Sequence, residues 1–456
     1  MKKEDMKGKK ILAVGFGRTG EAVAMVMSNM GSLVTIQDSR MEDEFDANLI
    51  TYFRDLGVKF HFGAVPEDLN AFDLIVLSPG VSPELDFVSR AASEGIEVIG
   101  ELELAYRLSN GKYIAITGTN GKTTTTTMVG EIFKTAGRSF HVAGNIGKAV
   151  IQVAVNADTD DYLITEVSSF QLETTVKFRP IISAILNLTE DHLNRHHTME
   201  AYGAAKARIF ANQKGNDCLI VNYDDDACMA LTNGCRARII PFSTKKELET
   251  GAFVRDGLMI LRRDGNETSL FNVNELKIIG KHNIQNALAA AAIAFWSGID
   301  SDMISEALIK FKGVEHRIEY CGLIDGVKYY NDSKGTNTDA SITAIKALVS
   351  NIVLIAGGDG KSQDFTPFAE MMPGRVKKLI LFGKDAGKIS EACSKINFKN
   401  ICFCKDMNDS VIEAASAAEP GDSVMLSPAC ASWDMYDNYE QRGRHFKQCV
   451  TALSYR

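Results

Sequence analysis

The segment TGTNGKTTTTT, at residues 117–127, places Lys122 and a run of threonines directly after a glycine turn. Residues 113–117, YIAIT, have the pattern of a buried strand, and the apolar residues after the threonines recur at helical spacing. A strand, a glycine turn and a helix in this order point backbone N–H groups at an anion, and the lysine can reach the β- and γ-phosphates of a nucleotide. The spacing is GTNGK[ST] rather than GxxxxGK[ST], because Ile116 stands where the first glycine would be. The segment predicts a triphosphate-binding loop made of Gly118, Thr119, Asn120, Gly121, Lys122, Thr123 and Thr124.

A triphosphate site also needs Mg²⁺ ligands, and Mg²⁺ prefers oxygen. The hydroxyl of Thr123 directly follows the lysine, and Glu166 ends the strand-like segment DYLITE, so both can hold the metal. By its chemistry alone, His192 in NLTEDHLNRHH is more typical of a hydrogen-bonding loop residue. Lys206, on a predicted helix, is more typical of a solvated lysine.

Residues 13–20, AVGFGRTG, form a complete GxGxxG turn after a strand, and Asp38 ends the next strand-like segment. Read alone, this is a dinucleotide fingerprint in which the acid binds a ribose, as in an NAD-dependent dehydrogenase. The separate triphosphate loop counts against NAD. A sugar nucleotide such as a UDP-sugar would satisfy the same turn, so both interpretations stay open at this point.

Three C-terminal segments carry lysines and hydroxyls where strands are expected to end: YYNDSKGTNTDA, AGGDGKSQDF and LSPACASWDMYDNYEQRG. Such donors suit a small ligand that bears carboxylates. Their recurrence in one predicted sheet favours a binding site over three unrelated surface loops. The candidate residues are Asp332, Lys334, Thr336, Lys361, Ser432 and Tyr439.

Short β-rich runs alternate with helical periodicity along the whole chain, as in KKILAVG, YIAITG and NIVLIAGG. This alternation predicts an α/β fold with parallel sheets covered by helices, which bind ligands at the carboxyl ends of their strands. A chain of 456 residues is long enough for about three domains of ~150 residues each. We predict a Rossmann-like N-terminal domain (1–104), a central P-loop-type ATPase domain with a mostly parallel sheet (105–312), and a Rossmann-like C-terminal domain (313–456).

The composition is that of an ordinary globular protein, with 45% hydrophobic and 24% charged residues. A formal net charge of −8 argues against nucleic acid or an anionic membrane as the main partner. No segment approaches the ~18 apolar residues of a transmembrane span, and the charged N-terminus argues against a secretory signal. Nine cysteines without a CxxC motif indicate reduced thiols, so we expect a cytoplasmic protein.

Eight segments in order resemble the Mur ligase family: GTNGKTT, EVSSFQLE, NLTEDHLNRH, KHNIQNALAA, HRIE, NDSKGTN, GGDGK and SPACASWDMYDNYEQRG. The resemblance spans almost the whole chain, and SSFQLE, GGDGK and SPACAS resemble the members that add D-glutamate. It implies three domains that match the three predicted blocks. These are a uridine-nucleotide domain, an ATPase domain, and a C-terminal domain that contacts ATP and the amino acid.

The resemblance implies an ATP-dependent amide ligase of peptidoglycan precursor synthesis. Its substrates would be UDP-N-acetylmuramoyl-L-alanine and D-glutamate. ATP would phosphorylate the free carboxylate, and the amine of D-glutamate would then displace the phosphate. The family pattern implies two Mg²⁺ ions, no nucleic acid, no membrane insertion and a monomer.

The resemblance also implies roles for individual residues, and for His192 and Lys206 it reverses the interpretation from chemistry alone. The implied catalytic residues are Lys122, His192 and Lys206. The implied metal ligands are Thr123, Glu166, His192 and Lys206, the last as a carbamate formed with CO₂. Asn286 would contact adenine, Arg317 the phosphates and Asp332 the ribose. The implied contacts of the UDP-muramoyl group are Arg18, Thr19, Ser39, Arg40, Ser78, Gly80 and Asn145. Those of the C-terminal substrate site are Lys334, Thr336, Lys361, Ser432 and Tyr439.

Three other functions are compatible with parts of the sequence. Another amino-acid ligase of this class would share most of the motifs, but the SSFQL and SPACAS segments argue against it. An NAD-dependent dehydrogenase would leave the triphosphate loop unexplained. A non-catalytic nucleotide-binding switch is favoured by nothing in the sequence.

Overall fold

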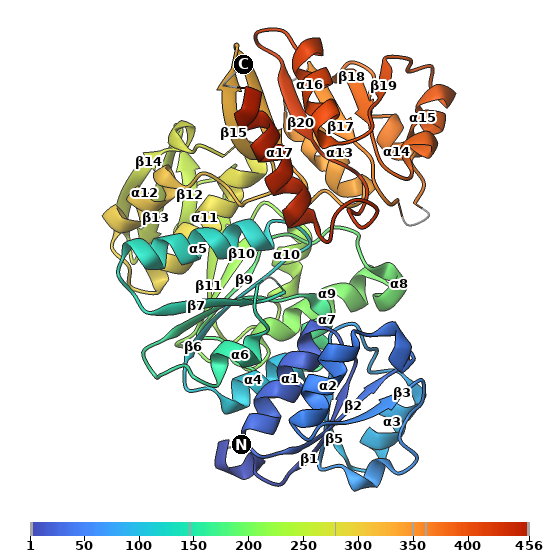
Figure 1. Cartoon of the computed structure of the whole chain (residues 1–456). Coiled ribbons are helices and arrows are strands. Elements are labelled where there is room, and N and C mark those ends of the chain that lie inside the picture. Colours follow the sequence, from blue (N-terminus) through green and yellow to red (C-terminus); the bar gives the residue numbers. More distant parts are fainter. Residues whose placement is uncertain (1–2, 146, 279, 349–350, 361–362, 454–456) are drawn as a thin grey trace. The chain divides into compact units, whose positions relative to one another are not determined.

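The computed structural model describes residues 3–145, 147–278, 280–348, 351–360 and 363–453 (Figure 1). Three sheets with helices packed against them confirm the predicted α/β class. The chain divides into two compact units, which we describe separately. The first unit is Met1–Leu276 with His282–Lys310, and the second unit is Lys277–Lys281 with Phe311–Arg456. Lys361 lies outside the described residues, and the predicted domain boundaries stay predictions.

The N-terminal sheet of the first unit has five parallel strands in the order β3-β2-β1-β4-β5. Ile11 and Ala13 of β1 join one hydrophobic cluster, whereas Leu12 and Val14 join another, so both faces of the strand are buried. Near-continuous apolar strands of this kind need helices on both faces. The elements are β1 (Lys10–Val14), α1 (Arg18–Asn29), β2 (Leu33–Asp38), α2 (Ala47–Asp55), β3 (Lys59–Phe62), β4 (Leu74–Leu77), α3 (Asp86–Ser93), β5 (Glu97–Gly100) and α4 (Glu101–Leu108).

The second sheet of the first unit has nine strands in the order β14-β13-β12-β11-β10-β9-β6-β8-β7. Strands β6 to β12 pair in parallel, whereas β12, β13 and β14 form an antiparallel extension. Parallel pairing sets Ile116 of β6 opposite Glu166 of β8, so the carboxyl ends of these strands meet at one edge. The strands are β6 (Lys112–Thr117), β7 (Phe140–Gly144), β8 (Tyr162–Glu166), β9 (Ile182–Ile185), β10 (Cys218–Asn222), β11 (Arg238–Ser243), β12 (Gly251–Arg255), β13 (Leu258–Arg263) and β14 (Asn266–Asn272). The helices are α5 (Lys122–Thr135), α6 (Val150–Ala154), α7 (Ser169–Glu173), α8 (Leu193–His196), α9 (Met199–Ala207), α10 (Asp226–Leu231), α11 (Lys281–Trp296) and α12 (Ser301–Lys310).

The sheet of the second unit has six strands in the order β15-β16-β20-β17-β18-β19, all parallel except β15. Two hydrophobic clusters cover its two faces, with Leu354 in one and Val353 in the other. The strands are β15 (Glu319–Ile324), β16 (Val327–Asn331), β17 (Ile352–Ala356), β18 (Val376–Leu381), β19 (Ile401–Phe403) and β20 (Ser423–Leu426). The helices are α13 (Thr338–Ala347), α14 (Thr366–Ala369), α15 (Ala386–Lys395), α16 (Met407–Ala417) and α17 (Tyr439–Leu453).

No helix in the described ranges is long and apolar enough to cross a membrane.

Glu101, the first residue of α4, is a buried carboxyl that joins two helices of the first unit. Its Oε1 accepts a hydrogen bond of 2.6 Å from the backbone N–H of Ile151, in the first turn of α6. Burial raises the pKa of Glu101 to about 7, although the nearby N–H groups and the charge of Arg18 act in the opposite direction. Above pH 7 the folded state therefore holds a buried anion that the unfolded state would solvate.

We expect Glu101→Gln to stabilise the protein at pH 8 and to leave its stability nearly unchanged at pH 4.5. The folded-state pKa is raised from 4.5, so wild-type stability falls between pH 4.5 and pH 7 and is then constant, whereas the amide does not ionise. The gain should be on the order of 3 kcal/mol. Urea unfolding of both proteins across this pH range measures it, with the exposed Glu94→Gln as the control. A gain that does not vary with pH would contradict the assignment.

Candidate functional site

The loop between β6 and α5 has the backbone of an anion-binding turn. Gly121 has φ +82°, in the left-handed region, and a Cβ there would lie 2.3 Å from Oδ1 of Asn286. A larger residue would therefore be strained and would clash with this side chain. The N-terminus of α5 has no side-chain cap, so its first N–H groups are directed toward the loop.

The threonine run of α5 is packed against the sheet rather than exposed. Thr123, Thr124, Thr125 and Thr126 are all buried. Thr127 donates to the carbonyl oxygen of Thr123 at 2.8 Å, whereas the hydroxyls of Thr125 and Thr126 donate to none of the described residues. Small β-branched side chains suit a helix that lies tightly on neighbouring strands, which explains why weak helix formers are tolerated here.

A second segment, after β9, anchors the loop. Asn187 accepts from the backbone N–H of Asn120 at 2.7 Å and donates to its carbonyl oxygen at 3.0 Å. The hydroxyl of Thr119 donates to the carbonyl oxygen of Thr189 at 3.1 Å and lies 3.3 Å from the hydroxyl of Tyr202. The loop is therefore fixed by the same segment that continues to His192.

Lys122 and Lys206 converge on one backbone carbonyl. Both Nζ atoms donate to the carbonyl oxygen of Gly118, at 2.9 Å and 3.0 Å, and Lys122 also donates to that of Thr119 at 2.9 Å. Lys206 is 1% exposed, so its interpretation as a solvated lysine is wrong. Burial, and to a lesser extent the positive charge of Lys122, lowers the pKa of Lys206 to about 7. About half of this amine is therefore neutral at pH 7, and a neutral amine is a nucleophile.

Glu166 has one carboxylate oxygen suited to a metal. Its Oε1 accepts a hydrogen bond of 2.9 Å from the side chain of Asn145. Its Oε2 is buried and accepts no hydrogen bond from the described residues. A buried oxygen of this kind is expected to have a partner, and Mg²⁺ prefers such oxygens.

Tyr202 is a neighbour of both His192 and Lys206. The ring centroids of His192 and Tyr202 are 6.4 Å apart, and the Nζ of Lys206 lies 4.4 Å from the centroid of Tyr202. The backbone of His192 is left-handed, with φ +55°. Among the described residues, no group of three or more His, Cys, Asp or Glu side chains could hold a metal ion. The predicted ligand set differs from such a group because it also uses a threonine and a modified lysine.

A cavity of about 560 Å³ lies at the carboxyl ends of the N-terminal strands. Gly15 of the glycine turn and the predicted Ser39 and Gly80 line it, and Ser78 donates to the carbonyl oxygen of Gly15 at 3.1 Å. Arg18 donates to the carbonyl oxygens of Gly144 and Asn145, at 3.4 Å and 3.3 Å, whereas Thr19 is half-buried in the first turn of α1. The full lining is Val14, Gly15, Gln37, Asp38, Ser39, Gly63, Ala64, Val65, Gly80, Val81, Ser82, Leu85, Phe87 and Arg195, which we call the N-terminal pocket.

Asp38 orders the rim of the N-terminal pocket. Its carboxylate accepts from the backbone N–H of Phe16 at 2.7 Å and pairs with Arg40 at 3.1 Å. Arg40 in turn lies over the ring of Phe45, 4.2 Å from the centroid. Both carboxylate oxygens of Asp38 are therefore used within the protein, which weakens the dinucleotide interpretation.

In the second unit, Arg317 lies in a strained turn. Its neighbours His316 and Ile318 have φ +64° and +43°, and the latter is a β-branched residue that rarely adopts this conformation. Asp332 anchors the turn, because it accepts from the backbone N–H of Ile318 at 3.2 Å and from the hydroxyl of Ser427 at 2.7 Å. Burial raises the pKa of Asp332 to about 7.

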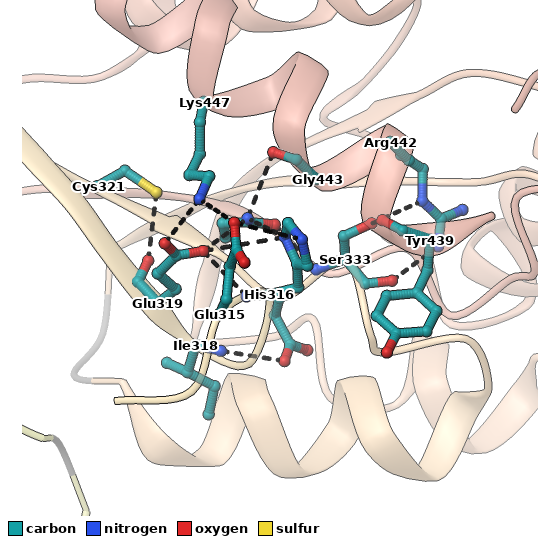
Figure 2. Close-up of polar contacts among 12 residues, drawn as sticks. Glu315, His316, Ile318, Glu319, Cys321, Ser333, Tyr439, Arg442, Gly443 and Lys447 are labelled. Atoms are coloured by element: carbon teal, nitrogen blue, oxygen red, sulfur yellow. Dashed lines mark hydrogen bonds and ion pairs between the residues drawn. The ribbon is translucent and has the colours of Figure 1, made fainter. Parts of the chain in front are cut away.

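Figure 2 shows how this turn is held against α17. The side chain of Asn331 donates to Glu319 and lies 2.9 Å from Nδ1 of His316. Lys447 pairs with both Glu319 and Glu315. The turn that carries Arg317 is thus fixed by ion pairs and hydrogen bonds within the second unit.

The predicted substrate residues Lys334, Thr336 and Ser432 lie on loops of the second unit. Tyr439 is the first residue of α17. The Nζ of Lys334 lies 5.7 Å from the ring centroid of Tyr439. Ser432 is buried, whereas Trp433 beside it is 65% exposed. The backbone N–H of Thr336 donates to the carbonyl oxygen of Lys334 at 2.9 Å.

Arg442 of α17 is a buried guanidinium that joins two of these loops (Figure 2). It donates to the hydroxyl and the carbonyl oxygen of Ser333, at 3.0 Å and 2.9 Å, and to the carbonyl oxygens of Cys430 and Ala431, at 3.0 Å and 3.2 Å. Burial lowers the pKa of Arg442 to about 10, so it stays charged at neutral pH.

We expect Arg442→Ala to destabilise the protein by about 3 kcal/mol or more, because hydrogen bonds to a charged group are lost and buried acceptors are left unpaired. The matched control is Arg444→Ala, two residues along the same helix and exposed, which should change stability by less than about 0.5 kcal/mol. Chemical unfolding of both variants measures the difference, and equal effects would refute the role of Arg442.

Three family models match the chain in order: the Mur ligase MurD-like N-terminal domain over residues 9–100, the Mur ligase middle domain over 116–294, and the Mur ligase glutamate ligase domain over 316–430. The UDP-N-acetylmuramoylalanine–D-glutamate ligase of Thermoanaerobacter sp. (strain X514) is 47% identical over 452 residues, 98% of this chain and 99% of the relative. The chain belongs to the Mur ligase family. The ligase of the same name from Clostridioides difficile (strain 630) is 43% identical and covers 98% of this chain and 100% of the relative. A crystal structure of the UDP-N-acetylmuramate–alanine ligase MurC from Thermotoga maritima shares the fold, with a TM-score of 0.58 and 20% identity over 97% of this chain and 99% of that one.

Three residues that order the candidate sites of this Mur ligase were not predicted from the sequence motifs. Arg195 lines the N-terminal pocket, and Glu173 pairs with it at 2.7 Å. Arg442 organises the loops of the second unit. All three lie inside segments that carry the family resemblance, namely NLTEDHLNRH, EVSSFQLE and EQRG, but their partners are too distant in sequence for spacing to reveal.

Proposed function

We propose that this Mur ligase joins D-glutamate to UDP-N-acetylmuramoyl-L-alanine with hydrolysis of ATP, in peptidoglycan precursor synthesis. The observation that carries the proposal is the full-length identity of 47% and 43% to two proteins that bear this ligase name. The loop of residues 118–124 supports ATP as the energy source, because its backbone and Lys122 suit a triphosphate.

We assign Mg²⁺ to the edge of the sheet where β6 and β8 end. The Oε2 of Glu166, which has no partner among the described residues, and the hydroxyl of Thr123 fit a hard cation there. His192 and Lys206 are the proposed ligands of a second ion. When bound, Mg²⁺ would supply positive charge against that of the transferring phosphoryl group.

Lys206 fits the carbamate that its family implies. Its amine, with a pKa near 7, can attack CO₂ while neutral, so that a C–N bond forms and one proton is released. The product is a carboxylate, which turns a cation into an oxygen ligand. Lys206 would then no longer place a second positive charge beside that of Lys122 at the carbonyl oxygen of Gly118.

In the proposed reaction, the carboxylate oxygen of the L-alanyl group attacks the γ-phosphorus of ATP, and the bond to the bridging oxygen breaks to release ADP. Lys122 and the N-terminus of α5 stabilise charge on the phosphoryl oxygens. The nitrogen of D-glutamate then attacks the acyl carbon. The tetrahedral intermediate releases phosphate and a proton and leaves an amide.

We place the sugar nucleotide in the N-terminal pocket, because the glycine turn and Ser39 and Gly80 line it. The proposed contacts of adenine, the ATP phosphates and the ribose are Asn286, Arg317 and Asp332. Those of D-glutamate are Lys334, Thr336, Lys361, Ser432 and Tyr439. We also propose a cytoplasmic protein, because the nine cysteines, all within the described residues, form no disulfide. We further propose a monomer, as the family resemblance implies.

The test is phosphate release by the purified protein with ATP, Mg²⁺, UDP-N-acetylmuramoyl-L-alanine and D-glutamate, with the product mass measured in parallel. The product should be heavier than the substrate by one glutamate residue. L-Lysine, meso-diaminopimelate and L-glutamate replace D-glutamate in matched reactions. Turnover with another amino acid and none with D-glutamate would refute the proposed specificity.

A further inference from the structure

Arg195, on the short helix α8, lines the N-terminal pocket beside Val81 and Ser82. Every other residue of the lining lies between positions 14 and 87. One cation from the segment that carries His192 therefore enters a pocket that is otherwise built by the N-terminal sheet.

The guanidinium of Arg195 is held in a defined position. Its Nη2 donates to the carboxylate of Glu173 at 2.7 Å and to the carbonyl oxygen of Val81 at 3.0 Å. Its Cζ lies 5.1 Å from the ring centroid of Phe170. Glu173 is itself fixed by His196, whose Nδ1 lies 3.3 Å from the second carboxylate oxygen.

Donors remain available on this fixed group. Both hydrogen bonds of Arg195 use Nη2, so Nε and Nη1 donate to none of the described residues. The side chain keeps 17% of its surface exposed. A planar cation with spare N–H donors at the wall of a pocket suits a phosphate oxygen.

The acidic residue of the pocket does not oppose an anionic ligand. Asp38 is paired with Arg40 and also accepts from the backbone N–H of Phe16. An incoming diphosphate would therefore meet a neutralised carboxylate and the donors of Arg195.

We propose that Arg195 is a substrate-binding residue of this ligase that donates from a spare N–H group, of Nε or of Nη1, to the diphosphate of the sugar nucleotide. The inference rests on the proposed function and extends it, because it assigns a substrate contact to the loop that carries His192. The competing role is a tether that only holds the loop of Val81 against Glu173.

Titration calorimetry with uridine, UDP and UDP-N-acetylmuramoyl-L-alanine separates the two roles. Arg195→Met should raise the Kd of UDP and of the sugar nucleotide about 10- to 100-fold, because a charge-assisted contact is lost. The Kd of uridine should change less than about twofold. Arg195→Lys, which keeps the charge but not the planar fork, should fall between the wild type and Arg195→Met.

Two controls complete the experiment. Arg138→Met removes an exposed arginine that also donates to a carbonyl oxygen, that of Gly298, and should leave all three Kd values unchanged. Glu173→Gln loosens the tether but keeps Arg195, so it should weaken UDP binding less than Arg195→Met. The Kd of UDP should also depend less on salt in Arg195→Met than in the wild type.

Equal effects of Arg195→Met on uridine and UDP, or an unchanged Kd of UDP, would overturn the proposal and leave the ligase assignment intact. Failure of the wild-type protein to bind any of the three ligands would overturn both.

Discussion

Lys122→Ala should reduce the rate of phosphate release by at least about 1000-fold and leave the fold intact. Lys122 is the cation of the phosphate loop, and the loss of charge stabilisation on a transferring phosphoryl group has effects of this size. Its Nζ donates to the carbonyl oxygens of Gly118 and Thr119, and the buried residues of α5 that pack against the sheet do not include Lys122, so the helix keeps its packing. Steady-state kinetics with the four components of the ligase assay measure the change.

The matched control is Lys134→Ala, in the last turn of the same helix. Lys134 is exposed and pairs with Glu131 across one turn, so its loss should change neither rate nor stability appreciably. Circular dichroism and thermal unfolding of both variants establish that the fold is retained. Near-normal turnover by a folded Lys122→Ala would remove the basis for the phosphate loop.

Lys206→Ala should lower turnover by at least about 100-fold, and short carboxylic acids such as acetate should restore part of it. If Lys206 acts as a carbamate, its loss removes an oxygen ligand from the site, and a small carboxylate can supply one. Alkylamines of the same size serve as the control. Rescue by the amines, with none by acetate, would show that the lysine acts as a cation.

The wild-type enzyme should also depend on pH and bicarbonate in a way that Lys206→Ala does not. The pKa of Lys206 is lowered to about 7, so acidification below pH 7 converts the amine to ammonium, which does not react with CO₂. Activity should therefore fall as the pH drops through 7, and it should fall in CO₂-depleted buffer and recover with added bicarbonate. Kinetics in degassed buffer measure this, and equal bicarbonate dependence of the two proteins would contradict carbamate formation.

Local patterns in the sequence led directly to the proposed phosphate loop and to Glu166 as a proposed metal ligand. A glycine turn between an apolar strand and a helix constrains neighbouring residues, and a carboxylate after a strand lies at a known edge of the sheet. Lys206 shows the limit of this reasoning. Its helical context is typical of a solvated lysine, yet the packed chain buries it beside Lys122 and shifts its pKa.

The roles of Arg195 and Arg442 could likewise not be predicted from local sequence patterns. Their partners lie 22 to 114 residues away for Arg195 and 11 to 109 residues away for Arg442. No spacing rule connects such positions, because helix and strand periodicity relate only neighbours along the chain.

The α/β class and the two glycine turns could be read from the chain itself, because they follow from spacing between near neighbours. Only the tertiary structure showed three other features. Lys206 is buried, Oε2 of Glu166 has no partner among the described residues, and Arg195 lines the N-terminal pocket. Desolvation and charge interactions depend on distance in space, and folding brings together groups that the chain keeps far apart.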